Sequence, residues 1–173
     1  MKKSYVILWS VLTLALTGCQ QDPEVNSLVG NYTYKASGVV TLQQSDTIFS
    51  DVHLTPETGT MTLTTTGKDK EVVLSFNQNS GDAYDITAIV TADSLYVRSF
   101  HRNIDVEVPQ DTLLTGDVIM RREIFDVEVK GAGHQLSNGE VCLMLSYSGV
   151  QRNDPDCLLH GQNIHVHCKP NAK

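Results

Sequence analysis

Basic residues and alanine are scarce in this 173-residue chain. Lys and Arg together number 13 against 20 Asp and Glu, and the pI is about 5.2. A nucleic-acid-binding domain needs clustered Lys and Arg to neutralise phosphates, so this balance excludes nucleic acid as a partner. Ala occurs 7 times, whereas Val and Thr occur 19 and 16 times. Because β-branched residues favour strands and Ala favours helices, the composition predicts an all-β fold in one domain.

Catalytic motifs are also missing. The chain contains no Gly-x-Ser-x-Gly sequence, which marks the nucleophile of many hydrolases. The paired acids Asp105 and Glu107 alternate with apolar Ile104, Val106 and Val108, which is typical of a solvated strand face rather than a catalytic dyad. We therefore predict a non-enzymatic protein without a cofactor.

Four potential metal ligands lie near the end of the chain: His160, His165, His167 and Cys168. On a strand, the His165 and His167 side chains would share a face about 6 to 7 Å apart, which suits two zinc ligands. Their alternation with Ile164 and Val166 favours a simpler interpretation, in which the imidazoles face solvent and the aliphatic side chains pack inside. No metal site is predicted.

The N-terminus has the form of a secretory signal. Lys2 and Lys3 precede an apolar stretch from residue 5 to 16, which is short for a membrane span. The following Leu16-Thr17-Gly18-Cys19 resembles the lipobox of bacterial lipoproteins, which are cut by signal peptidase II. This resemblance implies a signal peptide at 1–18, acylation of Cys19 with palmitate-type chains, and a lipidated tether at 19–28. An ordinary signal peptide with Cys19 in a disulfide is the alternative.

The residues after the cysteine indicate a destination. Gln20 stands where an Asp would retain many enteric-type lipoproteins in the inner membrane. Asp22 and Glu24 resemble the acidic export signal of some Gram-negative surface lipoproteins. The expected location is therefore the outer membrane, lipid-anchored on the cell surface, with its periplasmic face as the alternative.

The cysteines other than Cys19 are Cys142, Cys157 and Cys168. In an oxidising compartment an odd number of thiols leaves one unpaired. We predict a disulfide between Cys157 and Cys168, which would close a short loop, with a Cys142–Cys157 bridge as the alternative.

Residues 29–173 read as a single antiparallel β domain. Apolar residues alternate with polar ones in successive short runs, as in Val72, Leu74 and Phe76. Turn sequences such as Pro56-Glu57-Thr58-Gly59 and Ser137-Asn138-Gly139 separate the runs at intervals of about ten residues. This pattern predicts a meander that closes into a barrel or folds as a two-sheet β-sandwich.

The sequence Val29-Gly30-Asn31-Tyr32 resembles the Gly-x-Trp motif that opens lipocalins and other calycin barrels. Tyr32 replaces the family's Trp, and the lipocalin Thr-Asp-Tyr motif is missing. The resemblance covers the first strand and the general meander. It implies a lipocalin-like barrel that binds a small apolar ligand, with Tyr32 closing the barrel floor.

Two functions from different classes follow from this fold. A binding module would hold a small apolar ligand between inward-facing side chains, for which the candidates are Tyr34, Leu63, Phe76, Ile86 and Val127. A structural or protein-interaction lipoprotein would instead have a filled core and an exposed patch. The best candidates for that patch are Tyr96, Arg98 and Phe100.

The arginines are sparse and interrupted by acids. Arg98, Arg102, Arg121 and Arg122 are therefore predicted to pair with Asp or Glu on other strands rather than to form an anion site.

Overall fold

The computed structural model describes residues 23–92, 94–112 and 118–171. These residues form one short helix, α1 (Pro23–Leu28), and ten strands. The strands are β1 (Gly30–Ser37), β2 (Val39–Gln44), β3 (Thr47–His53), β4 (Glu57–Thr65), β5 (Glu71–Gln78), β6 (Ala83–Thr91), β7 (Ser94–Thr112), β8 (Val118–Gln135), β9 (Val141–Gln151) and β10 (Asp154–Pro170).

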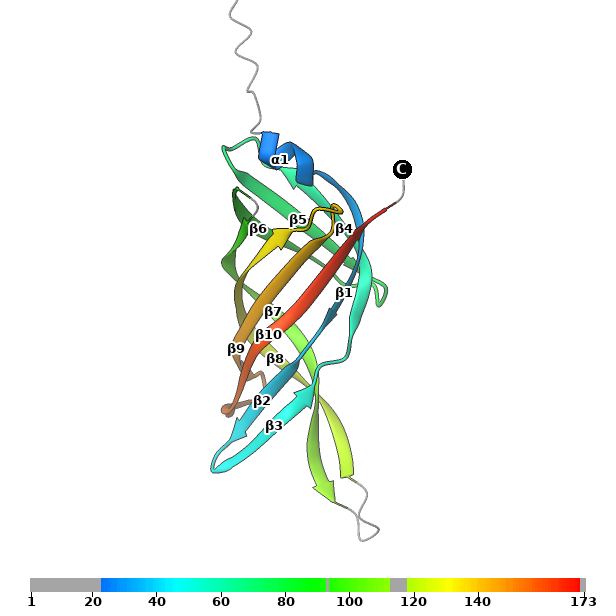
Figure 1. The fold of residues 1–173 in the computed structure, drawn as a ribbon. Helices are drawn as coiled ribbons and strands as arrows, with labels where there is room; N and C mark the ends of the chain where they lie inside the picture. The colour runs from blue at the N-terminus through cyan, green and yellow to red at the C-terminus, as the bar shows by residue number, and fades with distance from the viewer. Residues whose placement is uncertain (1–22, 93, 113–117, 172–173) are drawn as a thin grey trace, which may run out of the picture.

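Eight of the described strands close into an antiparallel barrel (Figure 1). Their order is β1-β4-β5-β6-β7-β8-β9-β10, and β10 pairs back with β1 from Tyr32↔Pro170 to Ser37↔His165. The predicted all-β meander and lipocalin-like barrel are confirmed. The sandwich alternative is wrong, because the β1–β10 pairing joins the two ends of the sheet.

The alternation of apolar and polar residues in the sequence places apolar side chains in the barrel interior. Alternate residues along the barrel strands are buried, so that Leu63, Leu74, Ile86 and Val127 all point inside with 0% exposure. Burial of such aliphatic side chains removes apolar surface from water and is the main source of the barrel's stability. The core is therefore the barrel interior itself.

Helix α1 covers one end of the barrel (Figure 1). Val25 and Leu28, three residues apart on one helix face, are each 3% exposed. Tyr32 lies just inside this end and its hydroxyl donates a 2.7 Å hydrogen bond to the carbonyl oxygen of Leu28. Part of the predicted tether at 19–28 is thus a helix packed on the barrel. Within the described residues, no helix has the length and apolar character needed to cross a bilayer.

Two hairpins extend from the opposite end (Figure 1). β2 continues β1 past Gly38 and pairs with the first half of β10, while β3 pairs with β2. The long strands β7 and β8 pair with each other beyond the point where β6 ends. This end of the barrel is therefore flanked by projecting strands.

One irregularity in β7 decides which side chains face the barrel interior. Val97 pairs with Gly131 and Phe100 with Val129, so three steps along β7 match two along β8. A bulge of this kind inserts one extra residue and reverses the alternation. As a result Phe100 and Arg102 face inward, in phase with Ile104.

Candidate functional site: a polar cavity between β6 and β7

The barrel wall opens between β6 and β7. Their pairing covers only Ala88–Thr91 and Ser94–Val97. Among the described residues, β6 from Ala83 to Thr87 pairs with β5 alone, and β7 from residue 98 onward pairs with β8 alone. A cavity of about 650 Å³ lies at this opening, at the barrel end away from α1.

The cavity has a polar and charged lining. Residues from the start of β4, the β5–β6 turn, β7, β8 and the β9–β10 turn contribute to it. The charged members are Glu57, Asp82, Arg102, Asp105, Arg122 and Arg152, and the uncharged ones include Thr55, Thr58, Gln78, Asn79, Ser80, Tyr84, Asn103, Ile104 and Ile124.

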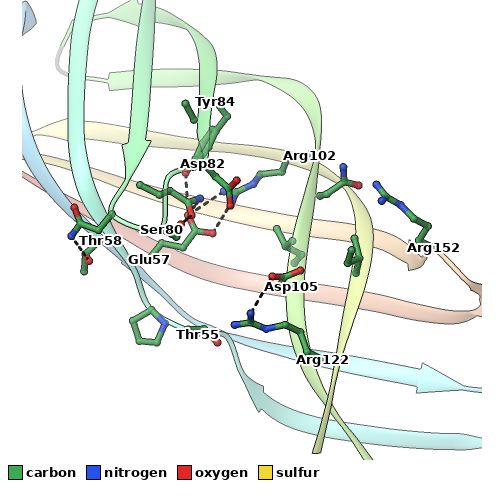
Figure 2. Close-up of a pocket in the computed structure, with 17 residues that line it drawn as sticks. Thr55, Glu57, Thr58, Ser80, Asp82, Tyr84, Arg102, Asp105, Arg122 and Arg152 are labelled. Atoms are coloured by element: carbon green, nitrogen blue, oxygen red, sulfur yellow. Dashed lines mark hydrogen bonds and ion pairs between the residues drawn. The ribbon is translucent and has the colours of Figure 1, made fainter.

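An ion pair joins Arg102 of β7 to Glu57 at the start of β4 (Figure 2). Arg102 Nη2 donates to Glu57 Oε1 at 2.7 Å and Nη1 donates to Oε2 at 3.3 Å, which makes the contact bidentate. The Gln78 side-chain amide donates a further bond of 3.1 Å to Glu57 Oε2. The Arg102 and Glu57 side chains are only 10% and 23% exposed, so water screens the ion pair weakly.

Aromatic rings hold the Arg102 guanidinium in place. Its Cζ atom lies 4.0 Å from the centre of the Tyr84 ring, a cation–π contact. Tyr84 is stacked on Phe76 at 5.0 Å, and Phe76 meets Tyr34 edge to face at 4.8 Å. These side chains lie below the cavity, and we call them the floor cluster: Tyr34, Phe76, Tyr84, Arg102 and Glu57.

The floor cluster keeps its arginine charged and its tyrosines neutral. Burial raises the pKa of Tyr34 to about 12, with a further contribution from the nearby Glu57 carboxylate. Burial also raises the pKa of Tyr84. Although burial by itself lowers the pKa of Arg102, interactions with Tyr84 and Glu57 outweigh it and raise this pKa. The floor cluster therefore presents a permanent, immobilised guanidinium below the cavity.

One polar atom of the floor cluster lacks a partner. The Tyr34 hydroxyl is buried and has no hydrogen-bond partner of good geometry among the described residues. An unsatisfied buried hydroxyl is costly, and a bound water or ligand atom at this point would remove the cost.

The other charged residues of the cavity lie at its outer edge, which we call the rim, and they include a second, weaker ion pair. Arg122 Nη1 lies 3.7 Å from Asp105 Oδ2, and both side chains are more than half exposed. Arg152 is also exposed, and it forms no ion pair with a described residue. Asp82 lies on the other side of the cavity, in the β5–β6 turn. The rim is therefore basic beside β8 and acidic beside β6.

The five predicted apolar ligand-binding residues all face the barrel interior. Their exposure runs from 0% to 4%, and none of them lines the cavity. Tyr34 and Phe76 belong to the floor cluster just below it. The remaining three, Leu63, Ile86 and Val127, lie among other core side chains.

The predicted surface patch is divided by the β7 bulge. Tyr96 is 55% exposed on the outer face, and Arg98 on the same face pairs with Glu71 at 3.0 Å. Phe100 is instead partly buried against the core, because the extra residue at the bulge turns it inward. The assignment of Phe100 to an exposed patch was wrong.

The predicted disulfide is not formed. Cys142, Cys157 and Cys168 are all free thiols. Cys157 and Cys168 lie on the same strand, β10, so their Cα atoms are separated by roughly 30 Å, whereas a disulfide needs less than about 7 Å. Cys142 pairs with His167 near the far end of β10, which also excludes the Cys142–Cys157 alternative.

The histidines of β10 face outward, as predicted. His160 and His165 are exposed, and His167 Nε2 lies 2.8 Å from Glu140 Oε2. Ile164 and Val166 are buried between them. In the described ranges no group of three or more His, Cys, Asp or Glu side chains is arranged to hold a metal ion.

Arginine pairing across strands was predicted correctly for three of the four arginines. Arg98, Arg102 and Arg122 pair with Glu71, Glu57 and Asp105 on other strands. Arg121 instead pairs with Glu123 of its own strand.

The cavity itself was not predicted, although the sequence holds one signal for it. Arg102 shares the phase of Ile104, Val106 and Val108, so a charge stands in a buried stripe. Its partner Glu57 was expected in a turn, but β4 begins at this residue and turns its side chain inward. The pairing of these two distant residues is a product of barrel closure.

Comparisons with known proteins give little for this chain. No model of a known protein family matches it, and no curated protein matches it. Among solved structures, it is similar to a variant of the vaccine antigen transferrin binding protein B from Haemophilus parasuis, at 11% identity and a TM-score of 0.37. That match covers 86% of this chain but only 28% of the other.

Proposed function

We propose that this chain is a non-enzymatic, lipid-anchored binding module that holds a polar ligand in the cavity between β6 and β7. The observation that carries the proposal is a cavity of about 650 Å³ above the buried Arg102–Glu57 pair. Ligand sites commonly have volumes of about 300 to 1,000 Å³ and occur at the mouths of β-barrels. Charged groups at fixed positions then select the ligand by its polar groups.

The distribution of charge describes the ligand. Glu57 and Asp105 are engaged by Arg102 and Arg122, which leaves Arg152 on one rim and Asp82 on the other. A ligand with an anionic group on the β8 side and hydrogen-bond donors on the β6 side complements both rims.

An apolar ligand inside the barrel is the alternative proposal. It would contact Tyr34, Leu63, Phe76, Ile86 and Val127, which are already packed against other side chains with at most 4% exposure. Such a ligand has to separate these side chains and lose their mutual contacts. The polar cavity requires no such rearrangement, and we prefer it for that reason.

The N-terminus supports a defined orientation on the membrane. Only three residues separate the proposed lipidation site, Cys19, from the first residue of α1, Pro23, which makes four chain steps between them. Four extended residues span at most about 14 Å. Because α1 packs on one barrel end, acylation of Cys19 would hold that end near the bilayer and direct the cavity away from it. This arrangement suits capture of a ligand or partner at the cell surface, or in the periplasm if the anchor lies in the inner leaflet.

Native mass spectrometry of protein extracted from the membranes of its own host tests the proposal. We expect the wild type to retain a polar molecule that is lost from the Arg152→Ala and Tyr84→Leu variants. Arg98→Ala is the matched control, because it removes an exposed arginine that pairs with Glu71 outside the cavity. An apolar molecule retained equally by all four proteins would favour the barrel interior and contradict the polar cavity.

A further inference from the structure

We infer that the ligand of this cavity is an extended polypeptide segment of a partner protein, which adds as a strand to the free edge of β7. This inference rests on the proposed binding function and specifies its ligand. Strand addition supplies affinity through main-chain hydrogen bonds and specificity through alternate side chains.

Both walls of the opening are strand edges. From Phe100 to Val108, β7 is paired with β8 in regular register, and none of the described strands pairs with its other side. β6 presents an equivalent edge from Ala83 to Thr87. Main-chain N–H and C=O groups that point away from the paired neighbour are available to a new strand.

The cavity gives direct access to these edges. Its lining includes Ala83 and Tyr84 on the β6 side, and Arg102, Asn103 and Ile104 on the β7 side. An inserted segment would therefore meet main chain as well as side chains. Its inward side chains would face the floor cluster, and its outward side chains would face the rim.

A comparison with β3 supports a specific role for the β7 edge. β3 is also an edge strand, but its pairing with β2 is interrupted between Val40 and Leu42, and Asp51 has a φ of 57°. Bulges and charged residues of this kind protect edges against unwanted pairing. The β7 edge stays regular until Pro109, after which the register with β8 shifts. The stretch that borders the cavity is thus left suitable for pairing, except near Ile104 and Asp105, where Leu54 and Thr55 line the same small crevice.

Charge selects the partner segment. Arg122 and Arg152 are exposed on the β8 side of the opening, and Asp105 partly neutralises the first of them. A segment in the cavity that directs an acidic side chain toward β8 would lie near both arginines, which line the same cavity. The occupant is accordingly an extended peptide segment with an acidic side chain on the β8 side.

The test uses a displayed library of random nine-residue peptides, selected on the wild-type barrel and counter-selected on the Arg122→Glu/Arg152→Glu variant. The peptide that binds best is then synthesised, both unmodified and with alternate amides N-methylated. We expect methylation of the set that faces β7 to weaken binding by about 100-fold, since several main-chain hydrogen bonds are lost. Methylation of the other set should weaken it less, and binding should slow amide hydrogen exchange in Phe100–Val108.

Two results would overturn the inference. The first is that N-methylation of neither set of amides weakens binding. The second is that every peptide selected on the wild type also binds the Arg122→Glu/Arg152→Glu variant. The native mass spectrometry described above separates these failures from failure of the cavity itself. A small polar molecule lost from Arg152→Ala would leave the binding site in place and reject the peptide strand as its ligand.

Discussion

At the scale of single residues, Arg102 is the feature that departs most from an ordinary β-barrel. It occupies an inward-facing position, pairs with Glu57 of β4 and lies on the Tyr84 ring. A buried charge of this kind is tolerated only when its partners compensate for lost hydration. The geometry therefore makes the stability of this barrel end depend on a pair that also forms the floor of the cavity.

Loss of one partner should be more harmful than loss of both. Arg102→Met leaves Glu57 without its counter-ion, and we expect a loss of about 3 kcal/mol in the free energy of unfolding. The double variant Glu57→Gln/Arg102→Met removes the orphaned charge and should recover part of this loss. Urea unfolding measures both.

Arg98→Met serves as the control, because the Arg98 side chain is 58% exposed and its partner Glu71 keeps Lys68 as a second counter-ion, so the pair should contribute less than about 1 kcal/mol. If the single and double variants lost the same free energy of unfolding, an unpaired Glu57 carboxylate would carry no cost, and the prediction would be wrong.

Two buried tyrosines, Tyr34 and Tyr147, give a prediction at alkaline pH. Burial raises the pKa of Tyr34 and of Tyr147 to about 12, above the ordinary value of 10.0. A raised pKa in the folded state favours the neutral phenol, so its contribution to stability is complete below pH 10 and is lost between about pH 10 and 12.

We expect the absorbance of these two tyrosinates to appear together with unfolding, and Tyr34→Phe/Tyr147→Phe to flatten the fall in stability over this range. The prediction would be contradicted if both residues gave tyrosinate absorbance while the circular dichroism of the β-sheet was unchanged.

At the scale of elements, close approach between strands depends on inward-facing glycines. An added Cβ at Gly149 on β9 would collide with the Asp126 carbonyl oxygen and lie 2.7 Å from Val127 Cα, both on β8. Gly131 on β8 has the same relation to Met144 and Leu145 on β9. These positions let β8 and β9 coil tightly around the barrel.

Gly149→Ala should therefore separate β8 from β9 locally. We expect thermal or urea unfolding to reveal a loss of about 1 to 3 kcal/mol, because backbone atoms have to shift. Ser148→Ala tests the neighbouring exposed position and should change stability by less than about 0.5 kcal/mol. Equal stability of the two variants would contradict the close approach.

At the scale of the whole molecule, the barrel has two unlike ends. Helix α1 covers one end, and the polar cavity opens at the other between projecting strands (Figure 1). A lipid at Cys19 would orient the barrel on the membrane, because α1, which covers one barrel end, follows Cys19 closely in the sequence.

Cys19→Ser should release the protein from membranes. Several acyl chains contribute about 0.8 kcal/mol per buried CH₂, so their loss removes a durable anchor. We expect the variant to appear in the soluble fraction and to lose incorporation of labelled palmitate, whereas Cys142→Ser should remain in the membrane fraction. Membrane retention of Cys19→Ser would contradict lipidation at this residue.

The sequence by itself determined the fold class and most of the core. Period-two alternation decides which side chains a strand buries, so the interior positions of Leu63, Phe76, Ile86 and Val127 could be predicted. Turn residues fixed the hairpins in the same local way, as Gly139 does with its φ of 82°.

Tertiary structure decided the candidate site. Barrel closure brings Glu57 of β4 to Arg102 of β7, and no local pattern encodes a contact across 45 residues. The bulge after Val97 turns Phe100 and Arg102 inward, and the separation of β6 from β7 opens the cavity beside them. These features depend on strand register, and register is set by the packing of the whole barrel rather than by the residues of one strand.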